Sequence, residues 1–195
     1  MGPWHLKKQC GFRVDAPFGW YGDRVTETGQ PAPAGQGHDA DADADVWLSP
    51  DQLASWISVA RLISRLPWAI DAQLQRDADL SMPEYMSLAI LSEQDDRTLR
   101  MSSLADRISV SLSRLSHLVK RLEARGYVRR EPDSCDGRFT NAILLPAGFA
   151  KLESAAAGHV AQVRHLVVDN LSAERLRRLG QDAERILARI DSPAR

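Results

Sequence analysis

The residues best suited to chemistry lie on one face of a predicted helix, residues 112–124. With successive residues set about 100° apart, short hydroxyls, an imidazole and cations share the polar face. Those side chains are Ser113, Arg114, His117, Lys120 and Arg121. The opposite arc is apolar and consists of Leu115, Leu118, Val119 and Leu122. Hydroxyl and imidazole groups can hydrogen-bond base edges in the DNA major groove, and arginine can pair with guanine through two bonds. The pattern favours contact with duplex DNA, although an ordinary solvated helix face carries the same residue types.

A second set of candidates lies in a polar turn, residues 133–138. A guanidinium at a hairpin tip could enter the narrow, negative minor groove, and Arg138 is placed to do so. Asp136, two residues earlier, could hold that arginine in position. Arg129 and Arg130 at the hairpin base could contact phosphates, or one of them could form an internal ion pair. Taken alone, the Asp-Gly pair in this turn favours an ordinary solvent-exposed turn.

The elements that position these residues are predicted to be two short helices. The first is expected over residues 102–108 with Ser102 as its N-cap, and the second over 112–124 with Ser111 as its N-cap. The expected DNA contacts from the second helix and its cap therefore also include Ser111 and Ser116.

A β-hairpin is predicted directly after these helices. Gly126 suits a left-handed helix exit. Residues 127–131 and 139–144 are expected to form the two strands. Helix, turn, helix and hairpin in this order predict a mainly α fold, a winged helix-turn-helix with a three-helix lobe and a β-hairpin wing.

Two helices are predicted before this region. One begins at Pro50 after Ser49, and Pro67 is expected to interrupt and kink it. The next begins at Ser81, which pairs with Glu84 in a capping-box pattern. It is expected to run to about residue 94, and a short extended piece follows over residues 99–101.

Two more helices are predicted after the hairpin. Pro146 opens a long helix, and a final helix follows Ser172. The apolar stripes of the terminal helices, about 50–78 and 146–191, exceed what one small lobe can bury. A second copy of the chain would cover them; a self-contained helical subdomain is the alternative.

The composition is that of one domain, or of one domain with an appendage. The chain has 195 residues, is 44% hydrophobic and carries a formal net charge of −1. Residues 100–140 nevertheless hold nine basic and five acidic side chains, a local excess that suits DNA phosphates. No apolar run is long enough to span a membrane, and no signal-peptide pattern is visible, so a cytoplasmic protein is expected.

Residues 1–45 differ from the rest and are rich in glycine, alanine, proline and aspartate. We expect a flexible tail there, unless translation starts downstream. The two cysteines, Cys10 and Cys135, form neither a disulfide framework nor a metal site. Asp133 and Asp136 flank Cys135 and disfavour its thiolate, which argues against redox sensing.

From about residue 47 to 190 the chain resembles the MarR family of transcriptional regulators. The family's wing signature is Asp, one residue, Arg, five residues, Leu-Thr, and a glycine three residues after the Thr. The matching positions are Asp136, Arg138, Leu144 and Gly148. The family's threonine is replaced by Leu145, which removes an N-cap hydroxyl worth about 1 kcal/mol. The run LVKRLE before Arg125 also matches the end of the family's recognition helix.

The resemblance implies a homodimer whose two winged domains bind a pseudo-palindromic operator, as a ligand-responsive repressor. It divides the chain into a tail (1–45) and a MarR-like domain (46–195), with a winged core at about 81–145 and dimerisation helices at about 50–78 and 146–191. Such proteins often bind small aromatic acids between the dimer helices and the DNA-binding lobe. Candidate effector contacts are Trp56, Arg61, Arg65, Trp68, Tyr85 and Met86. The same tryptophan and methionine residues could instead be ordinary core.

Two other classes of function remain to be weighed. A winged helix can serve as a protein-interaction module without sequence-specific DNA binding, but that use favours an apolar face over the cationic one seen here. An enzyme is not expected, because no nucleophile–base pair, phosphate loop or metal-ligand cluster is recognisable. No cofactor or metal is expected for the same reason.

Overall fold

The computed structural model describes residues 47–133 and 136–192. The predicted tail, residues 1–45, lies outside the described residues, as does Cys135. The described chain forms two compact units that meet in sequence at Leu66 and Pro67. Each unit is considered by itself.

The first unit contains the start of α2 (Pro50–Ala78). The helix begins as predicted: the Ser49 N–H donates to Gln52 Oε1 at 2.8 Å, and the Gln52 N–H donates back to Ser49 Oγ at 3.3 Å. The prediction that Pro67 interrupts this helix is wrong, because α2 continues through it to Ala78. Proline removes one internal hydrogen bond, which a helix of 29 residues can tolerate. The boundary between the two units falls at this same proline.

The second unit continues with α3 (Met82–Ser92), which begins at the predicted capping box. The Ser81 N–H donates to Glu84 Oε2 at 2.8 Å, and the Glu84 N–H donates to Ser81 Oγ at 3.4 Å. Together these bonds satisfy backbone groups that a helix start leaves open. α3 ends two residues before the expected boundary near residue 94.

The helix-turn-helix consists of α4 (Met101–Arg107) and α5 (Leu112–Ala124). α5 has the predicted bounds, and Ser111 Oγ accepts its capping bond from the Arg114 N–H at 3.3 Å. The prediction of Ser102 as the cap of α4 is wrong. The chain enters α4 directly from a strand, so that Arg100 is the N-cap and makes no side-chain capping bond.

Two residues with positive φ allow the tight turns around α5. Ser109, at φ 54°, lies between α4 and α5. Gly126, at φ 69°, follows the C-cap of α5, in agreement with the predicted left-handed exit. The Tyr127 N–H then donates to the Leu122 carbonyl at 2.9 Å, which ties the next strand to the helix end.

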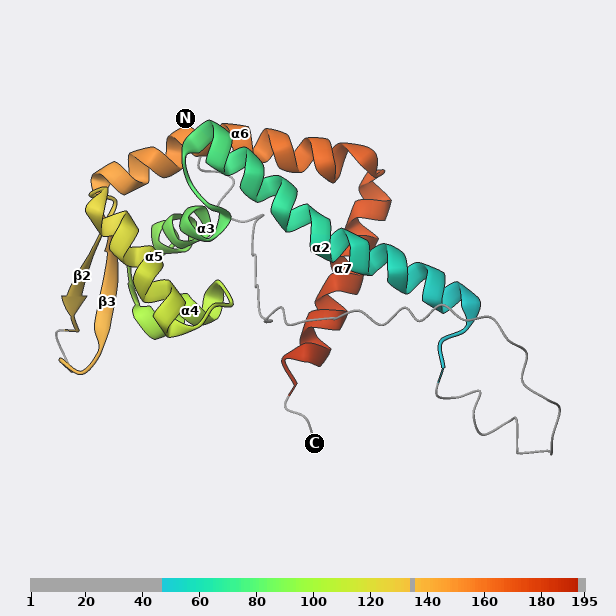
Figure 1. The fold of residues 1–195 in the computed structure, drawn as a ribbon, viewed down its shortest axis with the longest axis horizontal. Coiled ribbons are helices and arrows are strands. Elements are labelled where there is room, and N and C mark those ends of the chain that lie inside the picture. The colour runs from blue at the N-terminus through green and yellow to red at the C-terminus, as the bar shows by residue number, and fades with distance from the viewer. Residues whose placement is uncertain (1–46, 134–135, 193–195) are drawn as a thin grey trace, which may run out of the picture. The chain divides into compact units, whose positions relative to one another are not determined.

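The sheet has three antiparallel strands in the order β1-β3-β2. The wing hairpin consists of β2 (Val128–Pro132) and β3 (Thr140–Leu144), each displaced by about one residue from its prediction. The short extended piece predicted over 99–101 is β1 (Thr98–Arg100), which pairs with β3. Figure 1 shows the long β2–β3 hairpin projecting beside α4 and α5.

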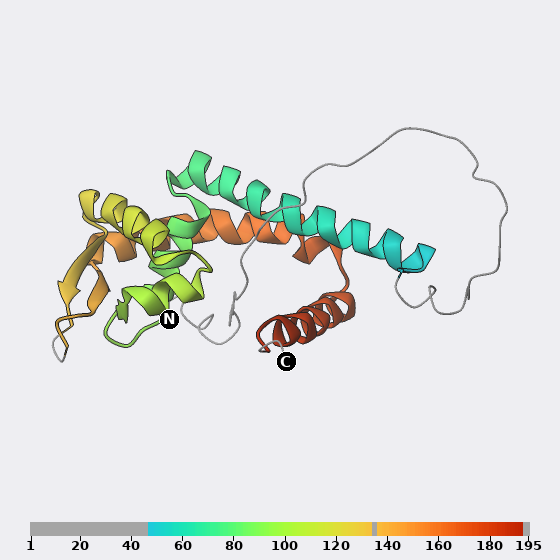
Figure 2. The same ribbon diagram turned by 60° about the horizontal axis from the view of Figure 1, so that its bottom comes forward.

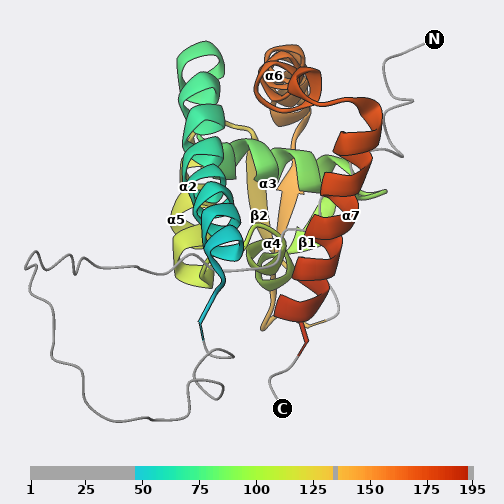
Figure 3. The same cartoon turned by 90° about the vertical axis from the view of Figure 1, so that its right-hand side faces the viewer.

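The chain continues through α6 (Pro146–Leu166), the short 3₁₀ helix η2 (Val168–Asn170) and α7 (Ala173–Ile190). Figure 2 shows α6 as one long helix that leads to α7, and Figure 3 looks along α6, which lies beside α3. A Cβ at Gly148 would lie 2.2 Å from the Tyr127 carbonyl oxygen, so the first turn of α6 can approach the wing base only because this residue has no side chain.

The core of the second unit is aliphatic and joins α3, α4 and α5 to the sheet. Its most deeply buried large residues are Leu74, Leu80, Leu88, Leu91, Leu104, Leu115, Val119, Leu122 and Val128. α5 thus packs its predicted apolar face inward and leaves its polar face toward solvent.

Candidate nucleic-acid interface

The exposed face of α5 carries several of the predicted DNA contacts. Ser113, Arg114, His117 and Lys120 are all exposed. Within the described part of the chain, no carboxylate pairs with Arg114 or Lys120. Their charges are therefore open to an anionic partner.

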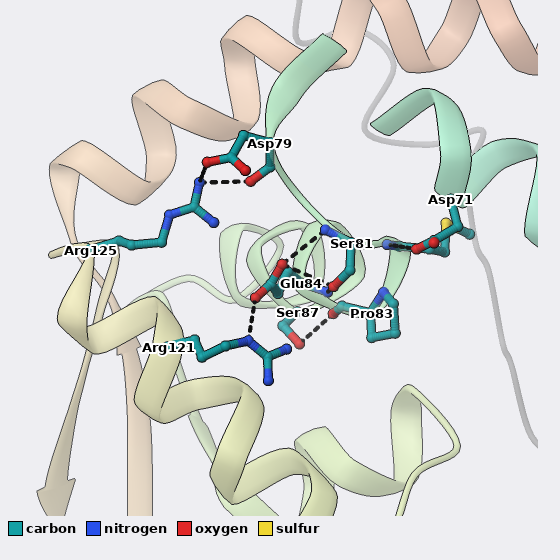
Figure 4. Close-up of polar contacts among 9 residues, drawn as sticks. Asp71, Asp79, Ser81, Pro83, Glu84, Ser87, Arg121 and Arg125 are labelled. Carbon is teal, nitrogen blue, oxygen red and sulfur yellow. Dashed lines mark hydrogen bonds and ion pairs between the residues drawn. The ribbon is translucent and has the colours of Figure 1, made fainter. Parts of the chain in front are cut away.

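Arg121 has a carboxylate partner within the fold. Its Nε donates to Glu84 Oε1 at 3.0 Å, and Figure 4 shows this contact joining α5 to the capping box of α3. Burial raises the pKa of Glu84, but the hydrogen bonds from Ser81 and Arg121 outweigh it and leave that pKa below its usual range. Arg121 thus helps to hold α5 against α3.

A similar contact near the same end of α5 joins this helix to the wing. Arg130 Nε and Nη2 lie 2.8 and 2.6 Å from Glu123 Oε2, and Arg130 Nη1 lies 3.4 Å from Ser116 Oγ. Of the two arginines at the wing base, Arg130 makes the internal ion pair that joins strand to helix. Arg129, its neighbour, is exposed and pairs with Glu131 on the same strand.

The wing tip brings Asp136 and Arg138 together. Arg138 Nη2 and Nε donate to Asp136 Oδ2 and Oδ1 at 2.6 and 2.9 Å. These bonds lower the pKa of Asp136 and raise the pKa of Arg138 above its usual value. Asp136 therefore has the contacts expected of a wing support, while the Arg138 side chain remains largely exposed.

A hollow of about 250 Å³ separates the wing from the helix-turn-helix. Arg130 and Arg138 line it, together with two residues that were not predicted as site residues, Arg100 and Phe139. In the sequence, Arg100 stood out only as one of many basic residues in its region. Its place beside the hairpin follows from the pairing of β1 with β3, which sets Arg100 opposite Asn141.

The six residues proposed for an effector site do not all fall within one compact unit. Trp56, Arg61 and Arg65 belong to the first unit, and Trp68, Tyr85 and Met86 to the second. In the second unit Trp68 is 74% exposed, whereas Tyr85 is 8% exposed and lies against the ring of His159 at 4.5 Å. Tyr85 is thus part of the core, and the effector site remains a prediction.

Two features are absent from the described residues, 47–133 and 136–192. None of their helices is both long and apolar enough to cross a bilayer. Among them, no three histidine, cysteine or acidic side chains gather as metal ligands would.

Comparison with known proteins gives consistent matches over the described region. Residues 80–140 match the model of the MarR family. HTH-type transcriptional regulator TtmR of Methylorubrum extorquens (strain PA1) is 34% identical over 70 residues, which is 36% of this chain and 35% of the relative. The match thus spans only about a third of that protein.

Two solved structures extend the match to nearly their whole length. Sco3205, a MarR family transcriptional regulator from Streptomyces coelicolor solved in complex with DNA, is 37% identical with a TM-score of 0.72, over 75% of this chain and 92% of that chain. AbsC, a MarR family transcriptional regulator from the same organism, is 33% identical with a TM-score of 0.70, over 74% of this chain and 97% of that chain. Since sequence and fold agree over almost the full length of both, this chain belongs to the MarR family of DNA-binding transcriptional regulators.

Proposed function

We propose that the protein acts as a homodimer that binds a pseudo-palindromic operator and represses transcription until a small aromatic acid releases it. The observation that carries this proposal is the pair of exposed cationic surfaces in one lobe. Arg114, His117 and Lys120 lie on the exposed face of α5, and Arg138 lies at the tip of the adjacent wing. A helix in the major groove and a guanidinium in the neighbouring minor groove would use both.

The DNA contacts differ in the roles we propose for them. Ser113, Arg114 and His117 read base edges, and Lys120 neutralises a phosphate. Ser111, whose hydroxyl already caps α5, binds a phosphate at the helix N-terminus. The remaining residues join α5 to α3 and to the wing, and they contact phosphates with the polar atoms that these contacts do not use. They are Ser116, Arg121 and Arg130.

Homodimerisation is supported by the apolar stripe of α7. This helix has no buried residue, and Leu179, Ile186 and Ile190 are 42%, 58% and 52% exposed. An apolar surface of this kind on a folded chain usually meets a partner. A second copy is the partner we propose, because two symmetric lobes would then read two half-sites of an inverted repeat.

Selection of bound duplexes from a random pool tests the proposal directly. The full chain is expected to recover an inverted repeat whose half-sites lie about one helical turn apart. Recovery of a single half-site would contradict the dimer. Failure to retain any duplex at low salt would contradict DNA binding and favour a protein-interaction module. Release by salicylate-like acids is then measured on the recovered operator, and an absence of release across a broad panel would remove the effector from the proposal.

A further inference from the structure

Arg100 occupies the junction between the sheet and the first helix of the helix-turn-helix. It is the last residue of β1 and the N-cap residue of α4. Its backbone is opposite Asn141 of β3. A side chain at this point can reach the wing while its backbone is fixed to the helical lobe.

The Arg100 side chain contacts both residues that close the wing turn. Its guanidinium carbon lies 4.4 Å from the centroid of the Phe139 ring, and its Nε lies 3.5 Å from Asp133 Oδ2. Asp133 and Phe139 are themselves joined, since the Asp133 N–H donates to the Phe139 carbonyl at 2.9 Å. Arg100 therefore holds the base of the turn from both sides.

From Asp133 the polar contacts continue to the wing arginine. The Asp136 N–H donates to Asp133 Oδ1 at 3.1 Å, and Asp136 in turn binds the Arg138 guanidinium. The other Asp133 oxygen accepts a bond from Asn141 Nδ2 at 3.2 Å, which fixes the carboxylate against β3. Asp133, which pairs with Arg100, thus also holds Asp136, the residue that binds the Arg138 guanidinium.

The charge of Arg100 also reaches the wing tip. The pKa of Asp136 is lowered mainly by its hydrogen bonds from Arg138, and the positive charge of Arg100 lowers it further. Arg100 and Arg138 line one hollow between the wing and the helices. Both cations therefore act on the same carboxylate.

We propose that Arg100 is a positioning residue that fixes the wing, and with it Arg138, relative to the helix-turn-helix. This inference rests on the proposed function, in which Arg138 and α5 bind neighbouring grooves of one duplex. The planar guanidinium is essential, because it can lie on the Phe139 ring and direct Nε at Asp133 at the same time. Lysine keeps the charge but loses that geometry.

The first test uses Arg100→Lys in the full chain on the selected operator. Loss of the stack is expected to weaken binding about five- to tenfold, although the charge is kept. Arg97→Lys is the matched control, since Arg97 directly precedes β1 and its guanidinium carbon lies 4.1 Å from the centroid of the Phe149 ring. The control is expected to bind within about twofold of the unmodified chain. Equal binding by Arg100→Lys and the unmodified chain would overturn the proposal.

A double-mutant cycle with Arg138→Ala distinguishes positioning from an independent contact. If Arg100 acts through Arg138, then Arg100→Lys is expected to have little further effect once Arg138 is alanine. Additive losses would mean that Arg100 acts alone, and would contradict the inference. Phe139→Leu should lower operator affinity about as much as Arg100→Lys does. Phe139→Tyr should keep the affinity of the unmodified chain, because it keeps the aromatic face.

Hydrogen exchange of the wing amides supplies a test that needs no DNA. In Arg100→Lys the Asp136 and Arg138 N–H groups are expected to exchange several times faster, while amides of α5 are unchanged. Unchanged wing exchange would overturn the positioning role even if DNA binding succeeds. Faster exchange in a chain that binds no duplex would instead support the positioning role and remove the proposed function.

Discussion

At the scale of single residues, the cations around α5 differ in what they already contact. Arg121 and Arg130 each bind a carboxylate that belongs to a neighbouring element, Glu84 and Glu123. Lys120, next to Arg121 on α5, is exposed and has no such contact among the described residues. We therefore expect adjacent positions on α5 to divide between holding the fold and binding DNA.

Replacement of two consecutive residues tests this division. Arg121→Ala leaves the buried Glu84 without its charged partner and is expected to lower the free energy of unfolding by about 1 kcal/mol, a value reduced for the exposure of Arg121. Lys120→Ala should leave stability unchanged. It should reduce the slope of log binding constant against log salt concentration by about 1, the value for one lost phosphate contact. Urea unfolding and binding titrations at several salt concentrations measure both. Equal effects of the two changes on stability would contradict the division.

A partly buried histidine gives the fold a dependence on pH. His159 of α6 is partly buried, and its Nδ1 has no hydrogen-bond partner among the described residues. Burial lowers the pKa of His159 below its usual 6.5. The unfolded chain therefore binds this proton more readily than the folded one, so stability is full above pH 6.5 and falls as the pH drops through the folded-state pKa.

His159→Phe is expected to remove this part of the pH dependence. The phenyl ring can keep the contact with Tyr85 but cannot take up a proton. The free energy of unfolding is compared between about pH 8 and pH 5.5, where an unperturbed histidine titrates. His165→Phe, at an exposed position of the same helix, is the control for introducing a phenyl ring. An identical slope in His159→Phe and the unmodified chain would show that this residue is not responsible.

At the scale of elements, helix starts could be predicted from sequence because their signals are local. Ser81, Ser111 and Ser172 each lie beside the backbone N–H that they cap, within three residues. The start of α4 could not be predicted, because its N-cap Arg100 is set by strand pairing with β3 about forty residues later. Sequence order gives no direct measure of such a contact.

The candidate interface shows the same difference between local and distant information. Helical periodicity predicted which side of α5 is buried and which is exposed, and the Asp136–Arg138 pair could be inferred from a spacing of two residues. The partner of Arg121 lies 37 residues away, so its role in holding α3 required the structure. The contact between Arg100 and Asp133 was missed for the same reason.

Gly126 allows a direct test of the helix exit that places β2 after α5. A Cβ there would meet no atom of the described residues within 4 Å, so the cost of Gly126→Ala comes from the positive φ of 69°. We expect a loss of about 1–2 kcal/mol in the free energy of unfolding. Gly137→Ala is the matched control, because among the described residues it too has open space, but it has no positive φ. It should change stability by less than about 0.5 kcal/mol. Equal losses at both positions would contradict the role of the left-handed exit.

At the scale of the whole molecule, charge and apolar surface are distributed unevenly. The net charge of the chain is only −1, yet residues 100–140 have an excess of basic side chains that lies around the wing and α5. α7, outside this lobe, exposes a stripe of leucine and isoleucine. DNA binding and self-association are thus proposed for different parts of one chain, and a change at α7 should affect DNA only through the loss of the second lobe.

Ile186→Asp tests that link. A carboxylate in the apolar stripe of α7 would be buried without a partner in the dimer, and we expect the chain to sediment as a monomer. Gln181→Asp adds the same charge on the opposite side of the helix and should leave the dimer intact. On the selected operator, the monomer is expected to bind a single half-site almost as tightly as the dimer does. It should lose the additional affinity that the second half-site provides, which is roughly 100-fold or more for linked sites. A monomer that still distinguished the full repeat from one half-site would contradict symmetric recognition, because one lobe cannot read two half-sites at once.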